Sequence, residues 1–126
     1  MTFPTVTLSN GLRVANFSSP HSFRFTDGSE LPACSFEHSD RGKLDTEEVE
    51  EPGIKGTTDV KICWKMSDGA RELHNEALHT SDVDVFLVPL PFMTALKEEG
   101  RPIGRFRVVR VADRNTKVIH TDRFCV

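Results

Sequence analysis

The sequence predicts an α+β domain, with N-terminal β-hairpins followed by strands and helices in the order β-α-β-α-β-β. Three observations predict this class: apolar residues alternate near both ends of the chain, glycines stand at turn positions, and two amphipathic segments lie between. We expect one mixed or antiparallel sheet with both helices on one face. The length of 126 residues fits a single domain, 1–126.

The first hairpin is predicted from the segment VTLSNGLRV. A two-residue Asn-Gly loop would pair Leu8 with Arg13 and leave apolar and polar residues mixed on both faces. A three-residue loop ending at Gly11 instead pairs Leu8 with Leu12, which makes one face apolar. Such a loop needs a left-handed residue in its third place, and glycine adopts that conformation most readily.

The second hairpin is predicted in the same way from FRFTDGSEL. A three-residue loop ending at Gly28 pairs Phe23 with Leu31 on one face. It pairs Arg24 with Glu30 on the other face, so that the charged residues point outward together. Two independent turns therefore predict the same loop type.

The middle of the chain is harder to interpret. Residues 32–56 are polar, acidic and interrupted by glycine, which predicts a long polar loop with one short edge strand near LDTEEVE. In the next segment, 58–66, the apolar residues Val60, Ile62 and Trp64 alternate with polar ones. This alternation predicts a half-buried strand.

Two helices and three strands are predicted in the rest of the chain. Ser67 is placed to cap a helix over 68–78, which buries Ala70, Leu73 and Ala77. The segment VDVFLVP follows, is apolar on both faces and predicts an interior strand, joined to strand 58–66 by a possible parallel crossover.

The second helix begins near Pro91, buries Phe92 and Leu96, and ends at Gly100. Two further strands surround a turn over 113–116 and complete the predicted sheet.

Composition narrows the function classes. The net charge of −3 gives no basic surplus, so a nucleic-acid partner is not expected. The longest apolar run is broken by two prolines and is too short to span a membrane. No signal peptide is recognised, and Cys34, Cys63 and Cys125 lack paired spacing, which predicts free thiols and a cytoplasmic location. No cofactor is predicted.

Two similar words, HSDR and HTDR, are the candidates for catalysis. If the chain is extended there, His38 lies on the same face as Asp40, and His120 on the same face as Asp122. A carboxylate beside a histidine can orient the ring as a general base. Two such pairs facing one another would suit a phosphoester hydrolase, although both words also read as ordinary turn and strand residues.

Other catalytic and metal-binding patterns are weaker. His74, His79, Asp82 and Asp84 lie close in sequence, but two histidines five residues apart on a helix point in different directions, so no metal site is predicted. Cys34 precedes a loop that contains a histidine and is the best candidate for a nucleophile. It also reads as a structural thiol.

The link between the hairpins, NFSSPHSFRF, is the preferred binding segment. Aromatic faces beside hydroxyl groups and arginines can hold a base and a phosphate. The phenylalanines would otherwise belong to the core. The predicted ligand-binding residues are Phe17, Ser18, Ser19, His21, Phe23, Arg105 and Arg107.

Two strings, TLSNGLRVANFSSPH and VVRVADRNTKVIHTDRFCV, resemble small uncharacterised accessory proteins of tailed bacteriophages. The resemblance covers most of the chain but contains no motif of known chemistry, so it assigns no site residue. It implies a protein that acts in the host cytoplasm.

The sequence therefore predicts a small non-enzymatic binding protein that forms a homo-oligomer. Its expected partner is a nucleotide-like small molecule or a host protein, as for phage counter-defence proteins. Two alternatives stay open: a phosphoester hydrolase and a structural component of the virion.

Overall fold

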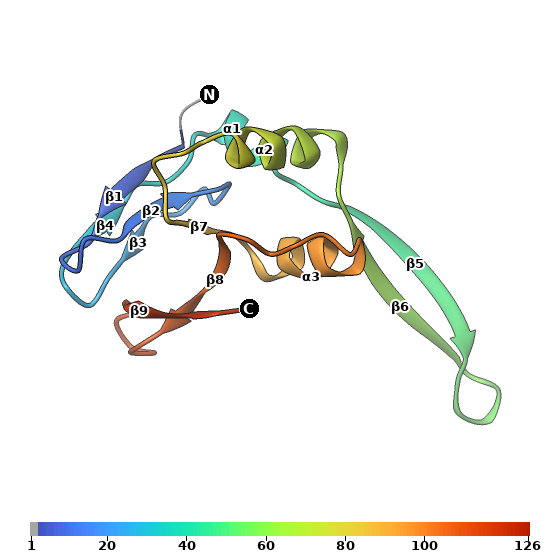
Figure 1. Cartoon of the computed structure of the whole chain (residues 1–126). Coiled ribbons are helices and arrows are strands. Elements are labelled where there is room, and N and C mark those ends of the chain that lie inside the picture. Colours follow the sequence, from blue (N-terminus) through green and yellow to red (C-terminus); the bar gives the residue numbers. More distant parts are fainter. Residues whose placement is uncertain (1–2) are drawn as a thin grey trace.

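The computed structural model describes residues 3–126 and shows a mixed α+β fold, as the sequence predicts. Its centre is a curled five-stranded sheet with the strand order β1-β2-β7-β8-β9 (Figure 1). These strands are β1 (Thr5–Thr7), β2 (Arg13–Asn16), β7 (Val85–Leu87), β8 (Phe106–Val111) and β9 (Ile119–Cys125).

The sheet is mixed because its two outer pairs are antiparallel and its inner pairs are parallel. β1 and β9 run antiparallel to their neighbours, whereas β7 lies parallel to both β2 and β8. Phe86 and Leu87 of β7 are both buried, although they point to opposite faces of the sheet. The prediction of an interior strand is therefore confirmed.

Both predicted hairpins are confirmed in register. Val6 pairs with Val14 in the first hairpin, and Gly11 has a φ of +87°. The second hairpin consists of β3 (Phe23–Arg24) and β4 (Glu30–Leu31), with Phe23 opposite Leu31. These registers could be predicted because they depend on the loop chemistry and on residues within a few positions of it.

Both long helices are also confirmed. α2 (Asp68–Leu78) begins after Ser67, whose side chain accepts a hydrogen bond from the backbone N–H of Ala70 at 3.1 Å. α3 (Leu90–Glu98) begins after Pro89 and ends before Gly100. Each helix buries the apolar stripe expected from the sequence.

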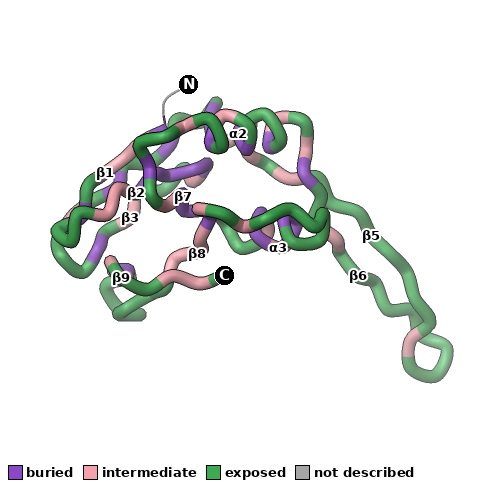
Figure 2. The backbone as a smooth tube through the Cα atoms, viewed as in Figure 1, coloured by how far each residue is buried: buried purple, intermediate pink, exposed green. Residues whose placement is uncertain are grey.

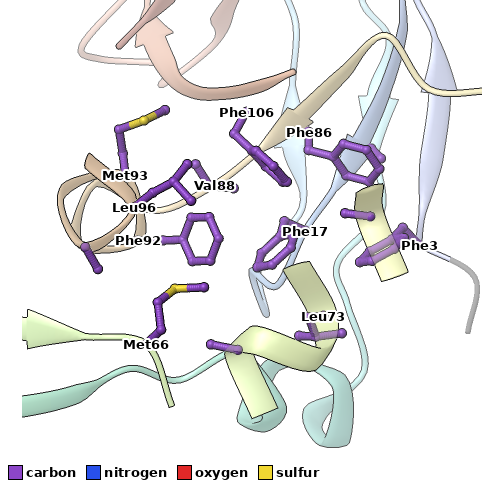
Figure 3. Close-up of a cluster of buried hydrophobic side chains, with 14 of the residues drawn as sticks. Phe3, Phe17, Met66, Leu73, Phe86, Val88, Phe92, Met93, Leu96 and Phe106 are labelled. Atoms are coloured by element: carbon purple, nitrogen blue, oxygen red, sulfur yellow. The ribbon is translucent and has the colours of Figure 1, made fainter. Parts of the chain in front are cut away.

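The core has two parts, one on each face of the sheet. On the helical face, α2 and α3 cover a cluster centred on Phe17, Phe86, Phe92 and Phe106 (Figure 3). On the opposite face, the β3–β4 hairpin covers a smaller cluster that contains Leu8, Val14, Phe25, Leu31, Leu87 and Ile119.

The prediction of a long polar loop over 32–56 is wrong, although the strand expected near LDTEEVE is present as β5 (Asp45–Pro52). The segment contains the short helix α1 (Phe36–Arg41), the strand β5 and a 3₁₀ turn at Ile54–Gly56. α1 is only six residues long and has no apolar stripe, and β5 is exposed on both faces. Neither element therefore has the apolar periodicity on which the sequence reading depends.

The prediction of a half-buried strand over 58–66 is wrong about burial. The strand exists as β6 (Thr58–Lys65), but it pairs with β5 along eight positions and forms an extended hairpin. We call this hairpin, residues 45–65, the arm. It projects from the body beyond α3 (Figure 1) and is almost entirely exposed (Figure 2). The parallel pairs of the main sheet are β2–β7 and β7–β8, so the crossover expected from this strand does not form.

Candidate functional site

The link between the hairpins contributes first to the core. Phe17 is fully buried, with its ring centroid 4.6 Å from that of Phe92 and 5.7 Å from that of Phe106. Ser18 is buried beside Gly42 at the end of α1, and a side chain at that glycine would collide with it. The side chains of Phe17 and Ser18 therefore pack inside the fold.

Asn16 holds the link in place, and sequence reasoning missed it. Its side chain is fully buried, accepts from the backbone N–H of Ser19 at 2.8 Å, and donates to the carbonyls of Ser19 and Pro32, both at 3.0 Å. One amide thereby joins the two ends of the segment that carries β3 and β4. An asparagine at the end of an apolar strand, shortly before a serine-proline turn, is the only local signal for this role.

Two of the predicted ligand residues, Ser19 and Phe23, line the same pocket. It has a volume of about 190 Å³ and is also bordered by Leu87, Leu90 and Val108. The lining is mainly apolar, and Leu90 is exposed at its edge. His21 is exposed, and its backbone N–H donates to the Ser19 hydroxyl at 3.1 Å. The pocket can hold a small, mainly apolar group.

The two predicted arginines are engaged within the protein. Arg105 donates from its guanidinium to the carbonyls of Ala77, Thr80 and Val83 at 2.6–2.8 Å, and it lies over the ring of Phe86. It thus satisfies carbonyl groups at the end of α2 and in the loop after it.

Arg107 donates to the carbonyls of Gly104 and Phe106. Neither arginine lines the pocket that contains Ser19 and Phe23.

No residue of the two His-Asp words lines the pocket that contains Ser19 and Phe23. His38 is buried in α1 and donates from Nε2 to the carbonyl of Phe17 at 2.7 Å, while Asp40 pairs with Lys43 on the surface. His120 is half-buried on β9, and Asp122 is exposed. Phe17 directly follows β2, and β7 and β8 lie between β2 and β9 in the sheet. The structure therefore keeps the words apart.

Cys34 is placed as a structural thiol. Its side chain is buried and lies 3.5 Å from the carbonyl of Asn16, and burial raises the pKa of the thiol to about 11. At neutral pH the thiol therefore stays protonated and is a poor nucleophile.

The residues considered for a metal site, His74, His79, Asp82 and Asp84, do not come together as a set of ligands. His74 is buried against Phe106, and burial, together with the positive charge of Arg101, lowers its pKa. His79 donates to a backbone carbonyl, and Asp84 accepts from the backbone N–H of Arg13. Within residues 3–126, no group of three or more His, Cys, Asp and Glu side chains could hold a metal ion.

The arm exposes three large apolar side chains along one strand. Val60 and Ile62 are 54% and 56% exposed, and Trp64 is 36% exposed. The three side chains lie on one face of β6, because alternate residues of a strand share a face. We call this set the apolar strip. The β5 residues opposite them in register are Thr46, Glu48 and Glu50.

The face of the arm that carries the apolar strip therefore also carries two carboxylates, Glu48 and Glu50. The lysines of β6 lie on the other face of the arm. There, Lys61 is opposite Val49, and Lys65 is opposite Asp45 and pairs with Glu47. The strip face is thus apolar and acidic, and neither strand presents a cation on that face. Sequence reasoning found the alternation but assigned it to the core.

The base of the arm meets the body at an open cavity of about 430 Å³. Trp64 borders it from the arm, Ala95 borders it from α3, and Arg71 and Glu99 form an ion pair at its edge. The strip therefore continues from this cavity outward along the arm.

The comparisons and the topology add little about function. No helix within residues 3–126 has the length and apolar content to cross a membrane. The chain matches no protein-family model, no curated protein and no solved structure. The resemblance to phage proteins accordingly stays a prediction.

Proposed function

We propose that the protein is a non-enzymatic protein-binding domain and that the arm is its docking element. The observation that carries the proposal is the apolar strip. Exposed apolar side chains are normal when scattered, but a row of them on a projecting hairpin is a surface that proteins usually cover. Burying Val60 and Ile62 against a partner would remove most of this apolar surface from water.

The arm also defines the chemistry of the partner. Glu48 and Glu50 stand beside the strip, and each would need a cation after contact, because an unpaired carboxylate is costly to bury. The partner therefore presents an apolar surface with basic residues at its rim. Such a surface belongs either to a host protein, which is the partner class that the phage resemblance suggests, or to a second copy of the chain.

The test is capture by a tagged chain in bacterial cells that also express an untagged copy, so that either a host protein or a second copy can be retained. We expect one stoichiometric partner with the wild type and its loss with the V60S/I62S variant. Losing two buried aliphatic side chains weakens binding by about 100-fold. Binding is then measured by titration calorimetry with the purified partner.

The matched control is V49S, because Val49 lies on the opposite face of the arm. It should retain the partner as the wild type does. Equal capture by V60S/I62S and the wild type, or no stoichiometric partner with either, would contradict the proposal.

A nucleotide-like ligand is the second candidate, favoured by the pocket that Ser19 and Phe23 share. Stacking on Phe23 would hold a base, and the Ser19 hydroxyl could bond its edge. We expect at least one mono-, di- or cyclic nucleotide to raise the melting temperature of the wild type but not of the F23A variant. A series without any shift would exclude this candidate.

A further inference from the structure

We infer that the partner of the arm is a second copy of this chain, which receives the apolar strip on its β8–β9 hairpin. This inference rests on the proposed docking role of the arm. Three features support it: opposite charge on the two hairpins, apolar surface on both, and their separation within one molecule.

The charges of the two hairpins are complementary. The arm, residues 45–65, contains six acidic and three basic residues, a net charge of −3. The hairpin over 106–125 contains five basic and two acidic residues, a net charge of +3. Arg110, Arg114, Lys117 and Arg123 are all exposed there. Two copies would therefore attract each other through unlike hairpins.

The receiving hairpin also offers apolar surface beside a cation. Val108 and Cys125 are half-buried opposite one another, and Arg123 shares the face of Cys125 because it lies two residues before it on β9. The first half of β9 is covered within the chain, because its Ile119 carbonyl accepts from the N–H of Thr26 and its Thr121 carbonyl accepts from Asn10. The second half, next to Arg123, is where a second copy can dock.

The arm points away from its own β8–β9 hairpin (Figure 1), so the contact is made between molecules. If each copy gives its arm to the other, the two contacts are identical and the assembly closes as a symmetric dimer. Two equal contacts also double the buried area, which brings the interface toward the size of stable dimers, roughly 1,200–2,000 Å².

Charge reversal on each surface tests the inference with the full chain. The E48K/E50K variant makes the strip face of the arm basic, and the R110E/R123E variant makes the receiving hairpin acidic. We expect light scattering during size-exclusion chromatography to give twice the 14.2 kDa of the chain for the wild type at low salt. Each variant alone should be monomeric, and dimers of the wild type should weaken at high salt.

An equimolar mixture of the two variants should recover the dimer, because both contacts of the mixed pair are then between opposite charges. Recovery also shows that both variants are folded. The matched control is E51K/D59K, which changes the charge of the arm equally but on its other face. It should remain dimeric.

A wild type that stays monomeric at 200 µM and low salt would overturn the inference, as would a mixture that fails to dimerise. If that monomer still binds a different protein through Val60 and Ile62, the proposed function stands and only the identity of the partner changes. If V60S/I62S dimerises and captures proteins as the wild type does, both proposals fail.

Discussion

Replacing Phe17 with alanine is expected to lower the free energy of unfolding by about 3–5 kcal/mol, the usual cost of removing a buried aromatic ring. The ring lies between those of Phe3, Phe92 and Phe106, and it connects the end of β2 to α3 and β8. Because these neighbours belong to different elements, the cavity cannot close by moving one side chain. The total free energy of unfolding of a domain of this size is about 5–15 kcal/mol, so the expected loss is a large share of it.

Urea unfolding followed by circular dichroism at 222 nm measures this loss. Phe36→Ala is the matched control, since Phe36 is 80% exposed at the start of α1 and should change stability by less than about 0.5 kcal/mol. A Phe17→Ala loss below about 1 kcal/mol would show that Phe17 is not the centre of the core.

Asn16→Ala is expected to cost about 3 kcal/mol, because it leaves several buried backbone groups without partners. The N–H of Ser19 and the carbonyls of Ser19 and Pro32 lose the amide that bridges them. We also expect faster hydrogen exchange in the β3–β4 hairpin, whose two ends this amide joins. Asn75→Ala is the control, since Asn75 is exposed on α2.

Asn16→Asp tests the donor role separately. The new carboxyl would face carbonyl oxygens, so its folded pKa would lie above the usual value of about 3.9. The folded state would then hold its proton to higher pH than the unfolded state, and stability would fall as pH rises above about 4. A variant whose stability relative to the wild type is the same at pH 4 and pH 7 would contradict this role.

The sequence was informative where structure depends on neighbours in the chain. Gly11 and Gly28 set two registers, and Ser67 set the start of α2, because each acts within a few residues. The sequence did not predict that the arm is exposed, because alternation identifies an apolar face of a strand and does not identify what covers that face. Val60, Ile62 and Trp64 have the pattern of a core strand, yet the core is completed by other elements.

The candidate site shows the same limit. A phenylalanine in a serine-rich link has the same local sequence whether it stacks on a ligand or on Phe92. Arg105 finds its acceptors 22–28 residues away, at the end of α2 and in the loop after it, and nothing near it in the sequence indicates them. Ser19 and Phe23 line one pocket, whereas Phe17, Ser18 and His21 belong to the same link and do not, so membership of the link alone does not identify the pocket residues.

The parallel pairing of β2 with β7 affects how the chain folds. Val14 must meet Val85, so the middle of the sheet joins segments that are far apart in sequence. During synthesis, the first hairpin must wait with its inner edge unpaired until most of the polypeptide has left the ribosome. Distant pairings of this kind slow folding toward milliseconds or seconds, and during that time the inner edge of the first hairpin stays open to pairing with other strands.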